Sequence, residues 1–145
     1  MGLRLPVGGV TVLLGPPGAR AATMAALDEG SGRCGAGHRE VPVVRLSAPR
    51  DQGVQAGLDA VEAARTGSAT IVLVDRLTGG LDGGDRRRVL TALRHLAAPG
   101  RAVLVDDDDP VAALAVADGV LRAGGPGGPS ISPVSELDAL DDLAS

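Results

Sequence analysis

The chain has 145 residues and a formal net charge of −4 at pH 7. Phe, Tyr, Trp, Lys and Asn are absent, so arginine supplies all 14 of the Lys and Arg positions. No lysine can anchor a phosphate and no aromatic ring can stack on a nucleobase. An acidic chain without aromatic platforms binds nucleic acid poorly, and we expect no nucleic-acid partner.

Short, uniformly apolar runs alternate with amphipathic stretches along most of the chain. A strand with one face in water would alternate polar and apolar residues, so these runs predict strands that are buried on both faces. We therefore expect an α/β fold, a mostly parallel sheet with helices on both faces. The expected elements are a strand over 10–14, a helix over 19–28, a strand over 41–46, a helix over 51–65, a strand over 69–74, a helix over 85–98, a strand over 102–105, a helix over 110–117 and a short strand near 120.

The composition changes after residue 122. Residues 123–133 are rich in Gly, Pro and Ser and are predicted to form a linker between a domain of residues 1–122 and an acidic tail, 134–145. Apolar residues recur every third position in the tail, which favours a short amphipathic helix with Ser132 as its cap and Pro133 at its first position. These apolar residues are Val134, Leu137, Leu140 and Leu143.

The segment that follows the first strand stands where a phosphate-binding loop is placed in many α/β proteins. That motif, G-x-x-x-x-G-K-(S/T), uses glycines so that backbone N–H groups approach phosphate, a lysine for charge and a hydroxyl for Mg²⁺. The octet here runs Gly15-Pro-Pro-Gly-Ala-Arg-Ala-Ala. Arg20 replaces the second glycine, Ala21 the lysine and Ala22 the hydroxyl residue.

The order of the downstream segments carries a more specific signal. An apolar run ending at Asp75 precedes Leu-Thr-Gly-Gly-Leu-Asp, an Arg-rich helix over 86–97, and a second apolar run ending in four aspartates. This succession resembles the nucleotide-binding domain of ATP-binding cassette (ABC) proteins, with its G-P-N-G-A-G-K-S-T, L-S-G-G-Q, L-L-D-E-P-T-S-G-L-D and T-H-D motifs. The resemblance covers residues 3–121, and Asp51-Gln-Gly-Val-Gln55 falls where the signature belongs.

The resemblance implies a set of site residues. Asp75 matches the carboxylate that holds Mg²⁺. The positions implied to contact nucleotide are Gly15, Gly18, Arg20, Thr23, Gln55 and Asp82.

It also implies a set of losses. Arg76 stands at the position of the catalytic glutamate and Asp108 at that of the switch histidine, so no catalytic residue is intact. Asp51 and Gln52 replace the leading residues of the signature. Between the first loop and the signature-like segment there is no room for the family's helical subdomain.

These losses predict a non-hydrolysing domain similar to an ABC transporter ATP-binding protein, acting as a pairing or regulatory subunit. ATP and Mg²⁺ are expected to bind weakly or not at all. The implied partners are a second copy or an intact ABC subunit, and through it a membrane permease.

Two alternatives stay open. One is an active phosphate-ligand or nucleotide-binding enzyme with improvised residues, Arg20, Asp75 and Asp108. The other is a decaying gene product without a selected function.

The expected location is the cytoplasm, peripheral to the membrane through a partner. The apolar run at 10–14 is too short to insert into a membrane, and the single cysteine, Cys34, excludes an intramolecular disulfide. The pair Cys34 and His38 lacks the further ligands of a structural metal site. The acidic run 106–109 reads more readily as a solvated loop than as a cation site.

Overall fold

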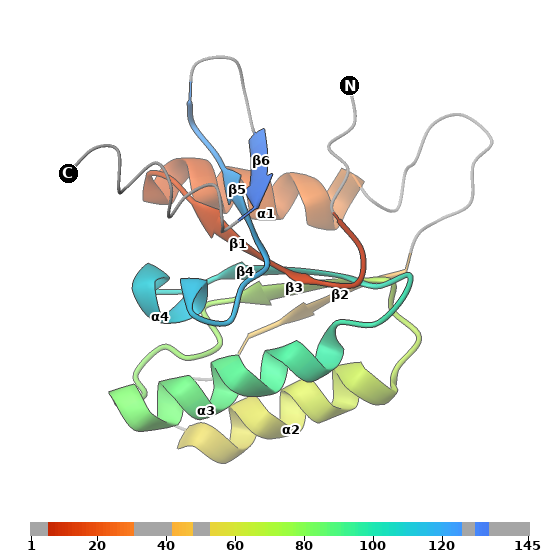
Figure 1. Ribbon diagram of the computed structural model, residues 1–145, viewed down its shortest axis with the longest axis vertical. Helices are drawn as coiled ribbons and strands as arrows, with labels where there is room; N and C mark the ends of the chain where they lie inside the picture. The colour runs from red at the N-terminus through yellow and green to blue at the C-terminus, as the bar shows by residue number, and fades with distance from the viewer. Residues whose placement is uncertain (1–5, 31–41, 48–52, 126–129, 134–145) are drawn as a thin grey trace.

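The computed structural model describes residues 6–30, 42–47, 53–125 and 130–133. Strands and helices alternate along these residues, as the sequence predicts (Figure 1). The elements are β1 (Val10–Leu14), α1 (Pro17–Gly30), β2 (Val43–Leu46), α2 (Gly53–Thr66), β3 (Ile71–Asp75), α3 (Gly83–Leu93), the short 3₁₀ helix η2 (Arg94–Leu96), β4 (Ala102–Asp106), α4 (Pro110–Leu114), β5 (Gly119–Arg122) and β6 (Ser130–Pro133).

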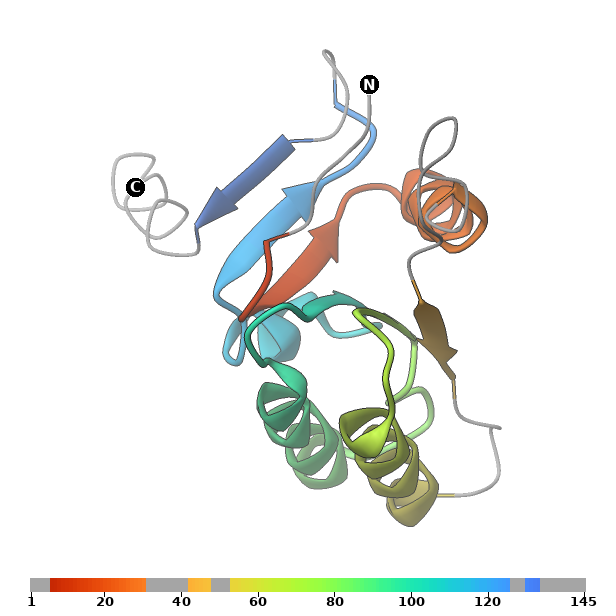
Figure 2. The same cartoon turned by 90° about the vertical axis from the view of Figure 1, so that its right-hand side faces the viewer.

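All the strands belong to one sheet in the order β2-β3-β4-β1-β5-β6. The strands from β2 to β5 are parallel to one another, and β6 is antiparallel to β5. Helix α1 covers one face, while α2 and α3 cover the other (Figures 1 and 2). The predicted α/β class, a mostly parallel sheet with helices on both faces, is confirmed. Between β2 and β3 the described residues contain one helix, α2.

The core has one apolar cluster on each face of the sheet. Alternate residues of β1 separate into the two clusters, with Val10 and Val12 on the side of α2, α3 and α4 and Leu13 on the side of α1. On the α1 side, Met24 and Leu104 are fully buried. Burial on both faces is why the strands are apolar at successive positions.

Several segments differ from the sequence-based expectation. Helix α4 ends at Leu114 and not at residue 117, and the helix expected over 85–98 is α3, Gly83–Leu93, followed by η2. Helix α1 begins at Pro17 and not near residue 19, because proline at the first helical position needs no N–H partner and already has a helical φ. The predicted linker over 123–133 ends in strand β6, and Ser132 and Pro133 lie in this strand instead of capping a helix. Proline is tolerated there because β6 is an edge strand. The helix predicted over 134–145 lies outside the described residues.

None of the helices in the described part of the chain is long and apolar enough to span a bilayer. Cys34, His38, Asp51 and Gln52 also lie outside the described residues.

The burial of the core residues can be tested by mutation. Leu104 has no exposed surface, so Leu104→Ala is expected to lower the free energy of unfolding by about 2–5 kcal/mol. Val111 is 76% exposed, so Val111→Ala is expected to change it by no more than about 0.5 kcal/mol. Urea unfolding followed by circular dichroism measures both. Equal effects of the two changes would contradict the assignment of the core.

Candidate functional site

The carboxyl ends of β1, β3 and β4 lie together at one edge of the sheet. From this edge β1 continues into α1 on one face, whereas β4 continues into α4, which packs with the cluster on the other face. Chain connections that leave in opposite directions open a crevice, and this is where open α/β sheets bind ligands. The candidate site is therefore the crevice between the ends of β1 and β4.

The octet that begins at Gly15 is mostly helix. The Arg20 N–H donates to the Pro16 carbonyl at 3.0 Å, which is the first hydrogen bond of α1. Arg20, Ala21 and Ala22 consequently belong to the first turns of the helix, and Ala21 and Ala22 are exposed. Only two residues connect β1 to α1, so there is no loop of successive backbone N–H groups to surround a phosphate.

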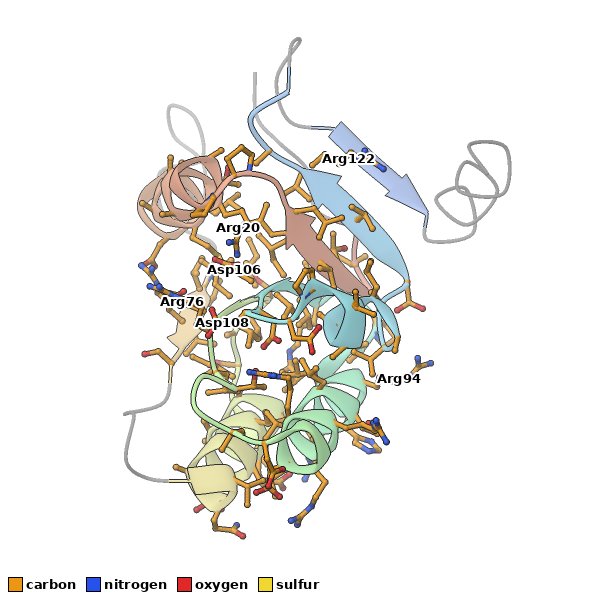
Figure 3. The ribbon with its side chains drawn as sticks, turned by 90° about the vertical axis from the view of Figure 1, so that its left-hand side faces the viewer. Arg20, Arg76, Arg94, Asp106, Asp108 and Arg122 are labelled. Carbon is orange, nitrogen blue, oxygen red and sulfur yellow. The ribbon has the colours of Figure 1, made fainter. Side chains whose placement is uncertain are left out.

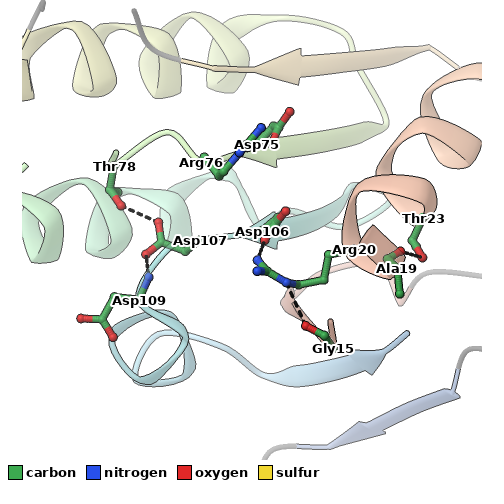
Figure 4. Close-up of polar contacts among 10 residues, drawn as sticks. All are labelled: Gly15, Ala19, Arg20, Thr23, Asp75, Arg76, Thr78, Asp106, Asp107 and Asp109. Atoms are coloured by element: carbon green, nitrogen blue, oxygen red, sulfur yellow. Dashed lines mark hydrogen bonds and ion pairs between the residues drawn. The ribbon is translucent and has the colours of Figure 1, made fainter. Parts of the chain in front are cut away.

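The Arg20 side chain lies in the crevice. Its Nε donates to the Gly15 carbonyl at 3.0 Å, and its Nη1 donates to Oδ1 of Asp106 at the end of β4 (Figure 4). The side chains of Arg20 and Asp106 are 21% and 7% exposed, so the ion pair is largely shielded from water. Burial raises the pKa of Asp106 above the usual aspartate range, and the hydrogen bond and charge of Arg20 partly offset that rise.

Gly15 and Gly18 were both predicted to contact nucleotide, but their surroundings differ. Gly15 has φ +137°, and a Cβ at this position would lie 2.3 Å from the Ala123 carbonyl oxygen. The close approach of the backbone after β5 therefore requires glycine at position 15. A Cβ at Gly18 would meet no atom within 4 Å, so nothing in the described structure requires glycine there.

Asp75, the predicted Mg²⁺ ligand, is held by arginines. Arg45 from β2 donates two hydrogen bonds to Oδ2 of Asp75, from Nε at 3.1 Å and from Nη2 at 2.6 Å, and also contacts Asp28 of α1 at 3.3 Å. The hydrogen bond to Asp75 is the main reason that the pKa of Arg45 is raised. Arg76 Nε approaches the other Asp75 oxygen at 3.4 Å. Both carboxylate oxygens thus have a cationic partner.

Arg76, at the position of the expected catalytic glutamate, has φ 51°. A non-glycine residue in this left-handed region carries about 1–2 kcal/mol of strain. Hydrogen bonds on both sides hold the conformation: its N–H donates to the Asp106 carbonyl at 2.8 Å, and its own carbonyl accepts from Gly79 at 3.2 Å. The side chain is 64% exposed, so this position presents a cation to solvent.

The acidic run 106–109, expected to be a solvated loop, is buried at its first two residues, because Asp106 ends β4 and Asp107 belongs to a buried polar cluster. Asp107 accepts a hydrogen bond from the fully buried Thr78 hydroxyl at 2.5 Å and another from the Asp109 N–H at 3.0 Å (Figure 4). Arg86 of α3 donates to the Thr78 hydroxyl at 3.1 Å and lies 3.7 Å from Asp107. The only signal in the sequence was the run of four aspartates itself, which does not show that the second one points inward.

Asp108 is exposed and lines a depression of about 120 Å³ beside Arg20 and Asp107. Pockets that bind small molecules and cofactors usually have volumes of about 300–1,000 Å³. Figure 3 shows Arg20 and Asp106 directed toward each other, with Asp108 beside them. The crevice exists, but its volume is small for a nucleotide.

Three further predicted residues have local roles outside this crevice. The Thr23 hydroxyl donates to the Ala19 carbonyl within α1 at 2.9 Å. Gln55 lies on α2, on the other face of the sheet, and donates to Asp59 at 2.8 Å. The Asp82 carboxylate caps α3 by accepting from the Asp85 N–H at 2.8 Å. The structure brings together Gly15, Arg20 and Asp108 but not these three.

The described residues do not fit Mg²⁺ and ATP as a ready site. Among them, every buried side-chain nitrogen or oxygen has a hydrogen-bond partner, so none is left for a missing ligand. No three His, Cys, Asp or Glu side chains within the described part of the chain are grouped to hold a metal ion. Binding at Asp75 would first require Arg45 to leave, and binding at Gly15 would require Arg20 to leave.

No protein-family model matches the sequence, and no curated protein matches it. Solved structures do match the fold. One is cbiO1 from Clostridium perfringens, described as part of the ABC transporter complex cbiONQ, with a TM-score of 0.59 and 13% identity over 99% of this chain and 84% of that one. Another is an ATP-binding subunit of an ABC transporter, with a TM-score of 0.57 and 11% identity over 97% and 85% of the two chains.

The RNase-L Inhibitor has a TM-score of 0.61 and 18% identity over 91% of this chain and 41% of its own. These likenesses show that the chain has the fold of ABC ATP-binding subunits. At such low identity they establish the fold alone.

The two glycines give a matched pair of variants. Gly15→Ala is expected to lower the free energy of unfolding by about 1–3 kcal/mol, because it adds a clash and a strained φ. Gly18→Ala is expected to raise it by about 0.5–1 kcal/mol, because alanine favours the helix and the space is open. Urea unfolding of both variants is the measurement. A destabilised Gly18→Ala protein would contradict the helical start at Pro17.

The ion pair in the crevice predicts a pH effect. Arg20→Gln removes the cation, so the pKa of Asp106 should rise further. A carboxyl whose folded pKa is raised contributes stability below its unfolded pKa, and this is lost as the pH rises through the folded pKa. As the pH rises from the unfolded to the folded pKa of Asp106, the free energy of unfolding of the variant should therefore fall further than that of the parent protein. Carboxyl ¹³C NMR titration measures the pKa, Arg122→Gln on the exposed end of β5 is the control, and an unchanged pKa would refute the pairing.

Proposed function

From the fold of ABC ATP-binding subunits, we propose that the chain is a non-hydrolysing member of an ABC-type assembly, a pairing or regulatory subunit. In this role the domain contributes a folded surface to a complex and leaves nucleotide hydrolysis to another subunit. The fold suggests the type of assembly, and the site supports the non-hydrolysing role, because one fold hosts many functions.

The main support for this proposal is the ion pair between Arg20 and Asp106, which already occupies the crevice. Arg20 fills the space beside Gly15 and is paired with Asp106. A phosphate entering there would have to separate this largely buried pair and take Arg20 for itself. Breaking a buried pair leaves an uncompensated carboxylate, which is costly.

The positions that would act on a γ-phosphate support the same conclusion. An activating carboxylate must polarise water, but Arg76 is a cation that points to solvent. The residue at the switch position must donate a hydrogen bond to phosphate, but the side chain of Asp108 is that of an aspartate, which serves as a hydrogen-bond acceptor. Electrostatic contacts of this kind each contribute about two to three orders of magnitude in rate, so their joint replacement removes the catalysis.

The partner in this proposal is a second copy or an intact ABC subunit, and through it a membrane permease. This assignment places the chain in the cytoplasm at the membrane surface. ATP and Mg²⁺ belong to the partner's site in this arrangement.

The improvised phosphate binder with Arg20, Asp75 and Asp108 is a weaker candidate. Arg20 and Asp75 are each engaged by a charged partner in the structure. A gene product without a selected function would also neither bind nor hydrolyse nucleotide. The existence of a specific partner subunit distinguishes the proposed subunit role from that alternative.

The proposal predicts no Mg-ATP hydrolysis by the purified chain and no shift of its melting temperature at millimolar Mg-ATP. A bound ligand at a hundredfold excess over its Kd would stabilise the fold by about 2.7 kcal/mol, which calorimetry detects readily. A phosphate-release assay completes the measurement, with Mg²⁺ alone as the blank.

Arg20→Ala and Arg122→Ala form a matched pair for the same assays. Arg20→Ala removes the side chain in the crevice and Arg122→Ala one on β5, and neither should create hydrolysis. Turnover of about 1–10³ s⁻¹ in the parent chain, lost in Asp75→Ala, would overturn the proposal in favour of the improvised enzyme.

A further inference from the structure

A second concave surface lies on the helical layer formed by α2 and α3, at a distance from the crevice. It is a groove of about 430 Å³ lined by Leu58 of α2 and by Gly84, Arg87, Arg88, Thr91, Ala92 and His95 of α3 and η2. This volume is within the usual range for pockets that hold ligands. Figure 2 shows the two helices side by side beneath the sheet.

The groove arises from close packing of the two helices. At Gly57 an added Cβ would lie 3.1 Å from Val89 Cγ2, so a glycine lets α2 approach α3. On the outer side Leu58, Thr91 and Ala92 line the groove, and Leu58 is half-buried. The groove is therefore an open depression that includes partly exposed apolar surface.

The rim of the groove is basic. Arg87 is exposed and makes no ion pair with any residue that the structure describes. Arg88 is 60% exposed and reaches Asp85 only at 3.7 Å. Arg86, by contrast, turns inward to the Asp107 cluster. Two adjacent arginines are thus available to an acidic partner.

A segment of this chain has the complementary chemistry. Residues 134–145, which lie outside the described residues, contain no basic residue and four carboxylates. These four carboxylates account for the whole net charge of −4, because the rest of the chain has equal numbers of arginines and carboxylates. The apolar residues at every third position, among them Leu137 and Leu140, match the apolar surface of the groove. Acidic flanks around a leucine stripe suit a groove with apolar surface and a basic rim.

We propose that the α2–α3 groove binds residues 134–145 of a second copy of this chain. The proposal does not depend on the function proposed for the crevice, because the groove lies on another surface. Two copies that exchange these segments reciprocally form a closed dimer, whose two grooves are both filled.

Reach favours a second copy over the chain's own groove. Strand β6 ends at Pro133 on the sheet edge, and two strands separate β6 from β4. At about 4.8 Å per strand this is about 14 Å across the sheet, and the helical layer lies about 10 Å beneath it, with the groove on its outer side. Residues 134–145 as a helix measure only about 18 Å. A helix beginning after Pro133 would end before it could lie along the groove of its own chain.

Disulfide trapping tests the proposal on the full chain. In a Cys34→Ser background, Ala92→Cys is combined with Leu140→Cys and the protein is mildly oxidised. The expected result is a disulfide-linked dimer on a non-reducing gel, formed at least tenfold faster than with Ala26→Cys and Leu140→Cys. Ala26 is exposed on α1, on the opposite face of the sheet, and is the matched control.

Charge reversal at the rim of the groove gives a second test with the same two introduced cysteines, at positions 92 and 140. Arg87→Glu with Arg88→Glu should slow dimer formation by about tenfold, and adding Asp141→Arg with Asp142→Arg should restore it. A disulfide within one chain would overturn the assignment to a second copy. Trapping no faster than in the control, or charge reversal without effect, would overturn the groove as the docking site. Neither outcome bears on nucleotide binding in the crevice.

Discussion

The ion pair between Arg20 and Asp106 joins the first turn of α1 to the end of β4. It forms because Arg20 lies near the start of α1, from which its long side chain reaches the carboxyl end of β4. The guanidinium reaches the Gly15 carbonyl and the carboxylate together, which a lysine ammonium does less well. This contact links β1, α1 and β4 within the crevice and partly offsets the effect of burial on the pKa of Asp106.

Other carboxylates at the carboxyl edge of the sheet are also paired within the protein. Asp75 is paired with Arg45, and Asp107 is satisfied by Thr78 and a backbone N–H. Charges buried without partners are costly. A site that binds phosphate and Mg²⁺ needs charged side chains that are not already paired with other residues of the protein. Here the protein's own side chains satisfy them. The charges at this edge are therefore paired within the protein.

The strands were predictable because burial on both faces leaves a direct mark on sequence, a run of apolar residues such as Val10–Leu14. The start of α1 was missed because two prolines read as a turn, although the second also suits the first position of a helix. Strand β6 was missed because a short polar segment with a proline gives no strand signal. The ion pairs could not be predicted at all: Arg20 and Asp106 lie 86 positions apart, and only the sheet order makes them neighbours.

The central position of β1 has a consequence for how the chain is made. Val10 pairs with Val103, and Thr11 pairs with Gly119, so β1 waits for partners that are synthesised about a hundred residues later. At about 5–20 residues per second, that wait is on the order of 5–20 s on the ribosome. Throughout it an apolar strand has no neighbour on either side. Such long-range pairing slows folding and leaves the apolar surface of β1 open to aggregation in the meantime.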